Sequence, residues 1–211
     1  NPPLFKEGLG EISTVQIPKS SDGRFPRYAD TPTGVSPRPT FGTQGGEHIV
    51  NSYEHDAYGM GIEELEDVQV MIDKRWKKMN ALEEALPGPK LYHSPLFKEG
   101  LGEISTVQDT KSDIVLFLFG GTKGPALEAQ KLLSDKGISV DIIQMQFIYP
   151  FKSEVVKKML SSYKKIICVE GNQSGQLEGI LMENTGIKPH QSIRSFYGRA
   201  FTAGEIVEKL K

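Results

Sequence analysis

Continuous apolar runs alternate with amphipathic segments along the second half of the chain. The run IVLFLF at 114–119 is typical of a strand buried on both faces of a sheet. Strands are expected at 114–119, 140–148, 165–170 and 192–197, and helices at 125–136, 152–163, 176–185 and 203–210. This repetition predicts right-handed crossovers and an α/β fold with an open, mostly parallel sheet and flanking helices over residues 109–211.

A single apolar stripe marks residues 62–86 as one amphipathic helix. Its members recur at steps of three and four: Leu65, Val68, Ile72, Trp76, Met79, Leu82 and Leu86. Acidic residues at 63–67 suit the positive end of the helix dipole, and the Pro-Gly-Pro sequence at 87–89 ends the helix. We expect this helix to link two parts of the molecule.

Residues 17–61, called the arm below, lack any helical or strand period. The arm is rich in Pro, Gly, Ser and Thr, which removes backbone donors and adds chain entropy. It also carries aromatic residues, in which disordered linkers are poor. We therefore expect a long irregular segment that is held against another surface and that comes from the end of a preceding domain.

The segment PLFKEGLGEISTVQ occurs twice, at 3–16 and at 95–108. The two copies are identical while their flanks are unrelated, which does not fit a solenoid repeat. One explanation is a docking peptide present twice; the other, which we favour, is a sequence insertion at 1–16 and 95–108 tolerated in surface loops. The insertion predicts that both copies lie at the surface.

Composition and charge exclude several classes of function. With 25 basic and 27 acidic residues the net charge is −2, so no nucleic-acid partner is expected. No apolar run is long enough for a membrane helix, and we expect no membrane association. The single Cys168 excludes an internal disulfide and an all-cysteine zinc or iron–sulfur site, and favours a reducing, cytoplasmic compartment. The chain opens at Asn1 without a signal peptide, and we expect a piece of a longer protein.

Two loops lie at the expected carboxyl ends of strands, where ligands bind in open α/β sheets. Their candidate cofactor-binding residues are Gly121, Thr122 and Lys123 in the first loop and Asn172, Ser174 and Gly175 in the second. Neither loop has the spacing of a dinucleotide fingerprint or a P-loop. A tight turn with interface contacts is the favoured interpretation of the first loop, and Ser174 is the expected N-cap of the helix after the second.

Three further residues are candidates for contacts with a partner. Arg38 lies between two prolines on stiff backbone, His55 is flanked by Glu54 and Asp56, and Trp76 lies on the amphipathic helix. A structural hydrogen-bonding role is the favoured interpretation of His55. We assign no catalytic residue and no metal ligand, because no nucleophile–base spacing and no helical His pair is present.

Six stretches together resemble the alpha subunits of 2-oxoacid:ferredoxin oxidoreductases. They are GVSPRP at 34–39, EHDAYG at 54–59, GTKGP at 121–125, YPF at 149–151, EGN with GQL at 170–177 and YGRAFT at 197–202. The match runs from about Arg24 to the end of the chain, and the pattern is most similar to the 2-oxoglutarate type. Each stretch alone is weak, and their common order makes the resemblance specific.

This resemblance implies a transketolase C-terminal-like fold and a role in a complex. The family decarboxylates a 2-oxoacid on thiamine diphosphate, forms an acyl-CoA from coenzyme A, and passes electrons through iron–sulfur centres to ferredoxin. Its beta subunit supplies the diphosphate and Mg²⁺ site, so this chain is expected to bind no cofactor and to be inactive alone. The alternatives are a free-standing Rossmann-like module for a nucleotide or phosphate at 120–124, and a non-catalytic scaffold whose repeats bind a partner.

Overall fold

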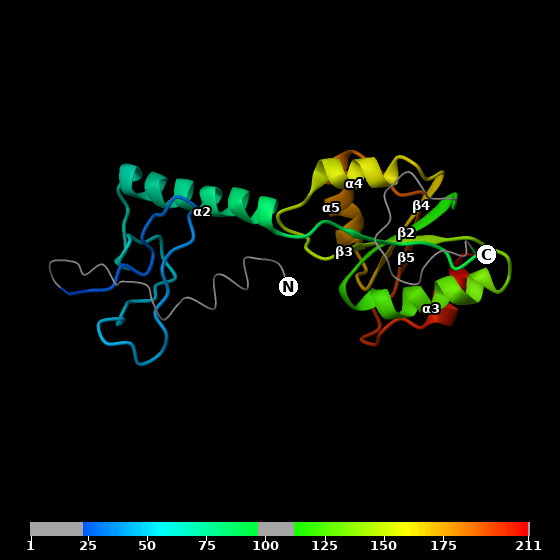
Figure 1. Cartoon of the computed structure of the whole chain (residues 1–211), viewed down its shortest axis with the longest axis horizontal. Helices are drawn as coiled ribbons and strands as arrows, with labels where there is room; N and C mark the ends of the chain where they lie inside the picture. Colours follow the sequence, from blue (N-terminus) through cyan, green and yellow to red (C-terminus); the bar gives the residue numbers. More distant parts are fainter. Residues whose placement is uncertain (1–22, 97–111, 211) are drawn as a thin grey trace. The chain divides into compact units, whose positions relative to one another are not determined.

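The computed structural model describes residues 23–96 and 112–210, and these form two units (Figure 1). The first unit comprises Asn1–Leu86 and the second Pro87–Lys211. Among the helices described, none combines the length and the apolar character that a membrane span requires.

The second unit is built on a five-stranded sheet of order β1-β3-β2-β4-β5. Its strands are β1 (Lys90–Tyr92), β2 (Ile114–Phe119), β3 (Asp141–Met145), β4 (Lys165–Glu170) and β5 (Gln191–Arg194). The pairs β2–β3, β2–β4 and β4–β5 are parallel, and β1 pairs antiparallel with β3. The predicted open, mostly parallel sheet is therefore confirmed.

Helices cover both faces of this sheet (Figure 1). On one face α4 (Ser153–Leu160) and α5 (Gln176–Thr185) pack on alternate residues of the central strands, such as Phe117 and Cys168. On the other face α3 (Lys123–Ser134) and α6 (Ala203–Lys209) pack on the intervening residues, such as Leu116. The central strand β2 is buried on both sides, as its continuous apolar run predicts.

The sequence pattern did not predict β1, and it misplaced several boundaries. β1 has only three residues, too few for a visible period, and the antiparallel register of Leu91 with Ile143 makes it an edge strand. The strands expected at 140–148 and 192–197 are shorter, because each chain segment leaves the sheet at its carboxyl edge to form a loop. A short 3₁₀ turn, η3 (Gly120–Thr122), leads directly into α3.

In the first unit the arm packs on helix α2 (Leu65–Ala85). Two ion pairs join them, Arg75 to Glu54 at 2.7 Å and Lys77 to Asp30 at 2.6 Å. The buried residues of α2 are Met71 and Lys74. Trp76 of the predicted apolar stripe is 58% exposed. The arm therefore packs on a different face of α2 from the one that carries Trp76.

The two repeat copies lie outside the described residues, apart from Pro95 and Leu96 at the start of the second copy. Both of these residues are exposed. The prediction that the copies lie at the surface therefore stays a prediction for the remaining residues.

Candidate site at the carboxyl edge of the sheet

A pocket of about 330 Å³ lies where β2 and β4 end. Three segments and one helical residue line it: 119–122, 170–172, 199–201 and Leu177. Because β2 and β4 are parallel neighbours, their carboxyl ends meet at one edge, and the loops that follow them converge there. The two candidate loops of the sequence analysis thus meet, and residues 199–201 complete the wall.

The carboxylate of Glu170 forms the polar floor of this region. Glu170 is 3% exposed, and it accepts hydrogen bonds from the backbone N–H groups of Leu177 at 2.9 Å and Glu178 at 3.1 Å. The side-chain amide of Asn172 donates to it as well, at 3.2 Å. The first free N–H groups of α5 are therefore capped by a carboxylate from the preceding strand, an arrangement that suits the positive end of the helix dipole.

This capping corrects the expectation for Ser174. The N-cap position of α5 is Gly175, which has a left-handed φ of 74° and no side chain that could cap the helix. The guanidinium of Arg194 lies against Gly175. A Cβ built on Gly175 would be 2.4 Å from that guanidinium. Ser174 is exposed and does not line the pocket.

Of the six predicted loop residues, the fold brings Gly121, Thr122 and Asn172 into the pocket wall. Thr122 is buried, and its hydroxyl donates to the carbonyl of Phe119 at 2.8 Å. Lys123 does not line the pocket, and its ammonium lies 5.4 Å from the centre of the Tyr92 ring. The loop is thus a tight 3₁₀ turn, and the interface contacts of its favoured interpretation stay a prediction.

Phe119 and Arg199 are among the pocket residues that sequence reasoning did not single out. Phe119 closes β2 and is 43% exposed, although it ends an otherwise buried strand. Arg199 reaches the pocket from the loop before α6, and its guanidinium pairs with Glu205 at 2.7 Å. Glu205 also completes a capping box with Thr202, and these bonds lower the pKa of Glu205, with the Thr202 N–H as the largest cause. The position of Phe119 at the very end of an apolar run was the available signal.

Cys168 is fully buried in β4 and faces α5. Burial raises the pKa of its thiol well above the usual range, and the nearby carboxylate of Glu170 raises it further. A thiol held in this protonated form is a poor nucleophile, in agreement with its interpretation as a small buried hydrophobe.

The donor set of the pocket does not fit a metal-bound diphosphate. The helix N-terminus that would hold the anion already binds Glu170, and the described residues contain no cluster of three His, Cys, Asp or Glu side chains. The exposed ring of Phe119, beside Ala200 and Arg199, instead suits an apolar side chain from another protein surface.

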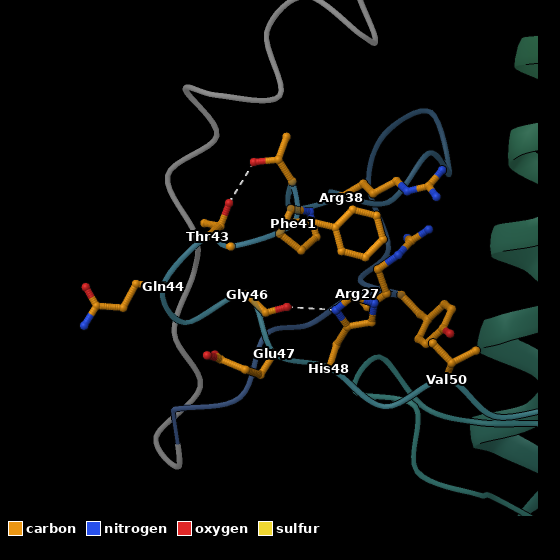
Figure 2. Close-up of a pocket in the computed structure, with 13 residues that line it drawn as sticks. Arg27, Arg38, Phe41, Thr43, Gln44, Gly46, Glu47, His48 and Val50 are labelled. Carbon is orange, nitrogen blue, oxygen red and sulfur yellow. Dashed lines mark hydrogen bonds between the residues drawn. The ribbon is translucent and has the colours of Figure 1, made fainter.

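The three interface candidates of the first unit have different surroundings. His55 is half-buried, its ring centre is 4.0 Å from that of Tyr28, and its Nδ1 lies 3.0 Å from the carbonyl oxygen of Asp56. Arg38 is exposed and lines a second pocket, of about 740 Å³, in the arm (Figure 2). Trp76 lies on α2 and lines neither pocket.

The chain is similar in sequence to one family model and to subunits of known enzymes. Residues 102–182 match the family model described as transketolase, C-terminal domain. The chain is 32% identical to subunit alpha of 2-oxoacid:ferredoxin oxidoreductase 2 from Aeropyrum pernix, over 89% of this chain and 27% of that protein. It is 30% identical to the corresponding alpha subunit from Saccharolobus solfataricus, over 88% of this chain and 27% of that protein. The chain thus spans about a quarter of these relatives.

A solved structure is similar to this chain over most of its length. It is the 2-oxoglutarate:ferredoxin oxidoreductase from Magnetococcus marinus with 2-oxoglutarate, coenzyme A and succinyl-CoA bound. The TM-score is 0.65 at 25% identity, and the match covers 91% of this chain and 31% of that one.

Proposed function

Because this chain is a homologue of 2-oxoacid:ferredoxin oxidoreductase alpha subunits, we propose that it is one part of such a subunit and acts only within the assembled enzyme. The observation that carries this proposal is the similarity over 89% of the chain, which includes both the arm with α2 and the sheet unit. A free-standing nucleotide module is not favoured, since it would not require the arm.

The proposed reaction is the oxidative decarboxylation of a 2-oxoacid to an acyl-CoA, with ferredoxin as the electron acceptor. The similarity to a 2-oxoglutarate enzyme supports 2-oxoglutarate as the substrate. A free thiol at Cys168 suits a reducing compartment such as the cytoplasm.

We further propose that thiamine diphosphate, Mg²⁺ and the iron–sulfur centre are held outside this chain. The pocket at the carboxyl edge has a capped helix N-terminus where a diphosphate would need free N–H groups. One cysteine is too few for an all-cysteine cluster. The contribution of this chain is then assembly, with residues 17–61 ending the preceding domain and the carboxyl-edge pocket receiving a side chain of the beta subunit.

Co-expression with the remaining alpha segment and the beta subunit tests this proposal. The complex should reduce ferredoxin with 2-oxoglutarate and coenzyme A, while the 211-residue chain alone should not. Phe119→Ser should lower the amount of beta subunit that co-purifies. Ile138→Ser is the matched control, because both side chains are 43% exposed and Ile138 lies outside the pocket. Failure to recover any beta subunit would contradict the assembly role.

A further inference from the structure

Two guanidinium groups face the arm pocket without a described acidic partner. Arg27 donates only to the carbonyl of Pro37, at 3.4 Å, and its guanidinium carbon lies 5.4 Å from the centre of the Tyr28 ring. Arg38 is exposed on stiff backbone between two prolines. In the described part of the chain, neither side chain forms an ion pair with a carboxylate.

Both residues line the pocket, and Figure 2 shows their guanidinium groups extending toward the same side of it. The carboxylate of Glu47, which also lines the pocket, points to the opposite side. Like charges repel when they are brought together, and an anion bound between the two groups would turn this repulsion into attraction. Two planar guanidinium forks suit the oxygens of a phosphate or carboxylate.

Positive charge also gathers around Lys74 of α2. Lys74 is buried beneath the arm, and its pKa is lowered, first by burial and then by neighbouring cations that include Lys78 and Arg27. Asp30 opposes this effect, but its carboxylate is already paired with Lys77. A bound anion would offset the remaining positive charge.

The rest of the pocket suits a planar ring. Phe41 is fully exposed and lines the pocket, and Figure 2 places its ring beside Arg38. The Nδ1 of His48 lies 2.8 Å from the carbonyl oxygen of Gly46, which leaves Nε2 of the ring for a ligand. A volume of about 740 Å³ is that of sites for drug-sized molecules.

We propose that the arm pocket binds an organic phosphate of the nucleotide type, with the phosphate between Arg27 and Arg38 and the planar ring on Phe41. Arg27 and Arg38 supply charge-assisted hydrogen bonds to the phosphate oxygens. Phe41 supplies stacking area that a free phosphate ion does not use. This site is separate from the carboxyl-edge pocket and does not depend on the proposed oxidoreductase assembly.

Calorimetric titration of the 211-residue chain with ADP, adenosine and inorganic phosphate tests this site. ADP should bind more tightly than either part alone. Arg38→Ala should weaken ADP binding by about tenfold or more, and Arg38→Lys should recover only part of it, because an ammonium lacks the planar fork. Phe41→Ala should weaken ADP binding and leave phosphate binding unchanged.

Lys136→Ala, at an exposed cation of the other unit, is the control for net charge and should bind ADP like the parent chain. Circular dichroism verifies that each variant is folded, which is expected because Arg38 and Phe41 are exposed. Absence of ADP binding, or equal ADP affinity in the parent and Arg38→Ala, would overturn the proposal. So would an equal loss of ADP affinity in Lys136→Ala.

Discussion

Gly34 lies so close to Lys74 of helix α2 that a side chain cannot be placed between them. A Cβ built on Gly34 would be 2.5 Å from the carbonyl oxygen of Lys74 and 2.6 Å from the backbone nitrogen of Lys78. Gly34 also has a φ of 71°, a conformation that other residues rarely adopt. The turn that precedes Ser36 and Arg38 is thus seated directly on the helix backbone.

Gly34→Ala should detach the arm from α2. The new methyl group meets rigid helix backbone, so the arm must move in addition to the strain of the positive φ, and we expect a loss of about 3 kcal/mol or more. Hydrogen exchange of the Tyr28 amide, which donates to Ala57, reports the seating of the arm. Gly45→Ala is the matched control, since its φ is 75° with open space around the Cβ, and should cost only about 1–2 kcal/mol. Equal protection in the two variants would contradict the close-approach argument.

Glu170→Gln should destabilise the sheet unit by about 1–3 kcal/mol. The amide keeps one acceptor oxygen but replaces the other with a donor that faces the N–H groups of α5. Urea unfolding followed by far-UV circular dichroism measures the change. Trp76, the single tryptophan, lies in the first unit, so its fluorescence transition should stay in place. Glu183→Gln, at an exposed position of α5, is the control and should unfold like the parent chain. An unchanged urea midpoint in Glu170→Gln would show that the cap is dispensable.

Glu178 should make the stability of the sheet unit depend on acid pH. The Ser192 hydroxyl and then Arg194 lower the pKa of Glu178 below its ordinary value of 4.5. Because its pKa is lower in the folded state, its stabilisation is present above about pH 5 and decreases as the pH falls through the folded value. Glu178→Gln should therefore flatten the decrease in unfolding free energy between about pH 5 and pH 3. The same dependence of unfolding free energy on pH in the parent and in Glu178→Gln would contradict this linkage. Glu208→Gln, at an exposed position, serves as the control.

Residues 87–94 should be necessary for a stable sheet unit. β1 places Leu91, which is 4% exposed, against β3, and the carbonyl of Tyr92 accepts a hydrogen bond from Gln130 at 3.0 Å. The segment 109–211 lacks these contacts and should be about 2–5 kcal/mol less stable than 87–211. Deletion of 95–108 from the longer segment removes the repeat but keeps β1, and should change the urea midpoint little. A large loss in that variant would contradict the insertion interpretation.

The sequence predicted most elements of the sheet unit, because buried parallel strands and the helices that cover them have strong periods. The strand at 114–119 and the helix at 176–185 were placed with the bounds that the structure has. β1 could not be predicted, since three residues carry no period and its place depends on pairing with β3. The burial of Lys74 on α2 could not be predicted, because it depends on the arm that packs on the helix.

For the candidate sites, the sequence by itself determined which loops follow the carboxyl ends of β2 and β4, since element order and parallel pairing place them at one edge. Only the tertiary structure decided what those loops hold. It decided that Glu170 caps α5, that Phe119 and Arg199 line one pocket although they are distant in the chain, and that Arg27 and Arg38 line the arm pocket. Such contacts depend on backbone paths between elements, and local side-chain preferences carry no information about them.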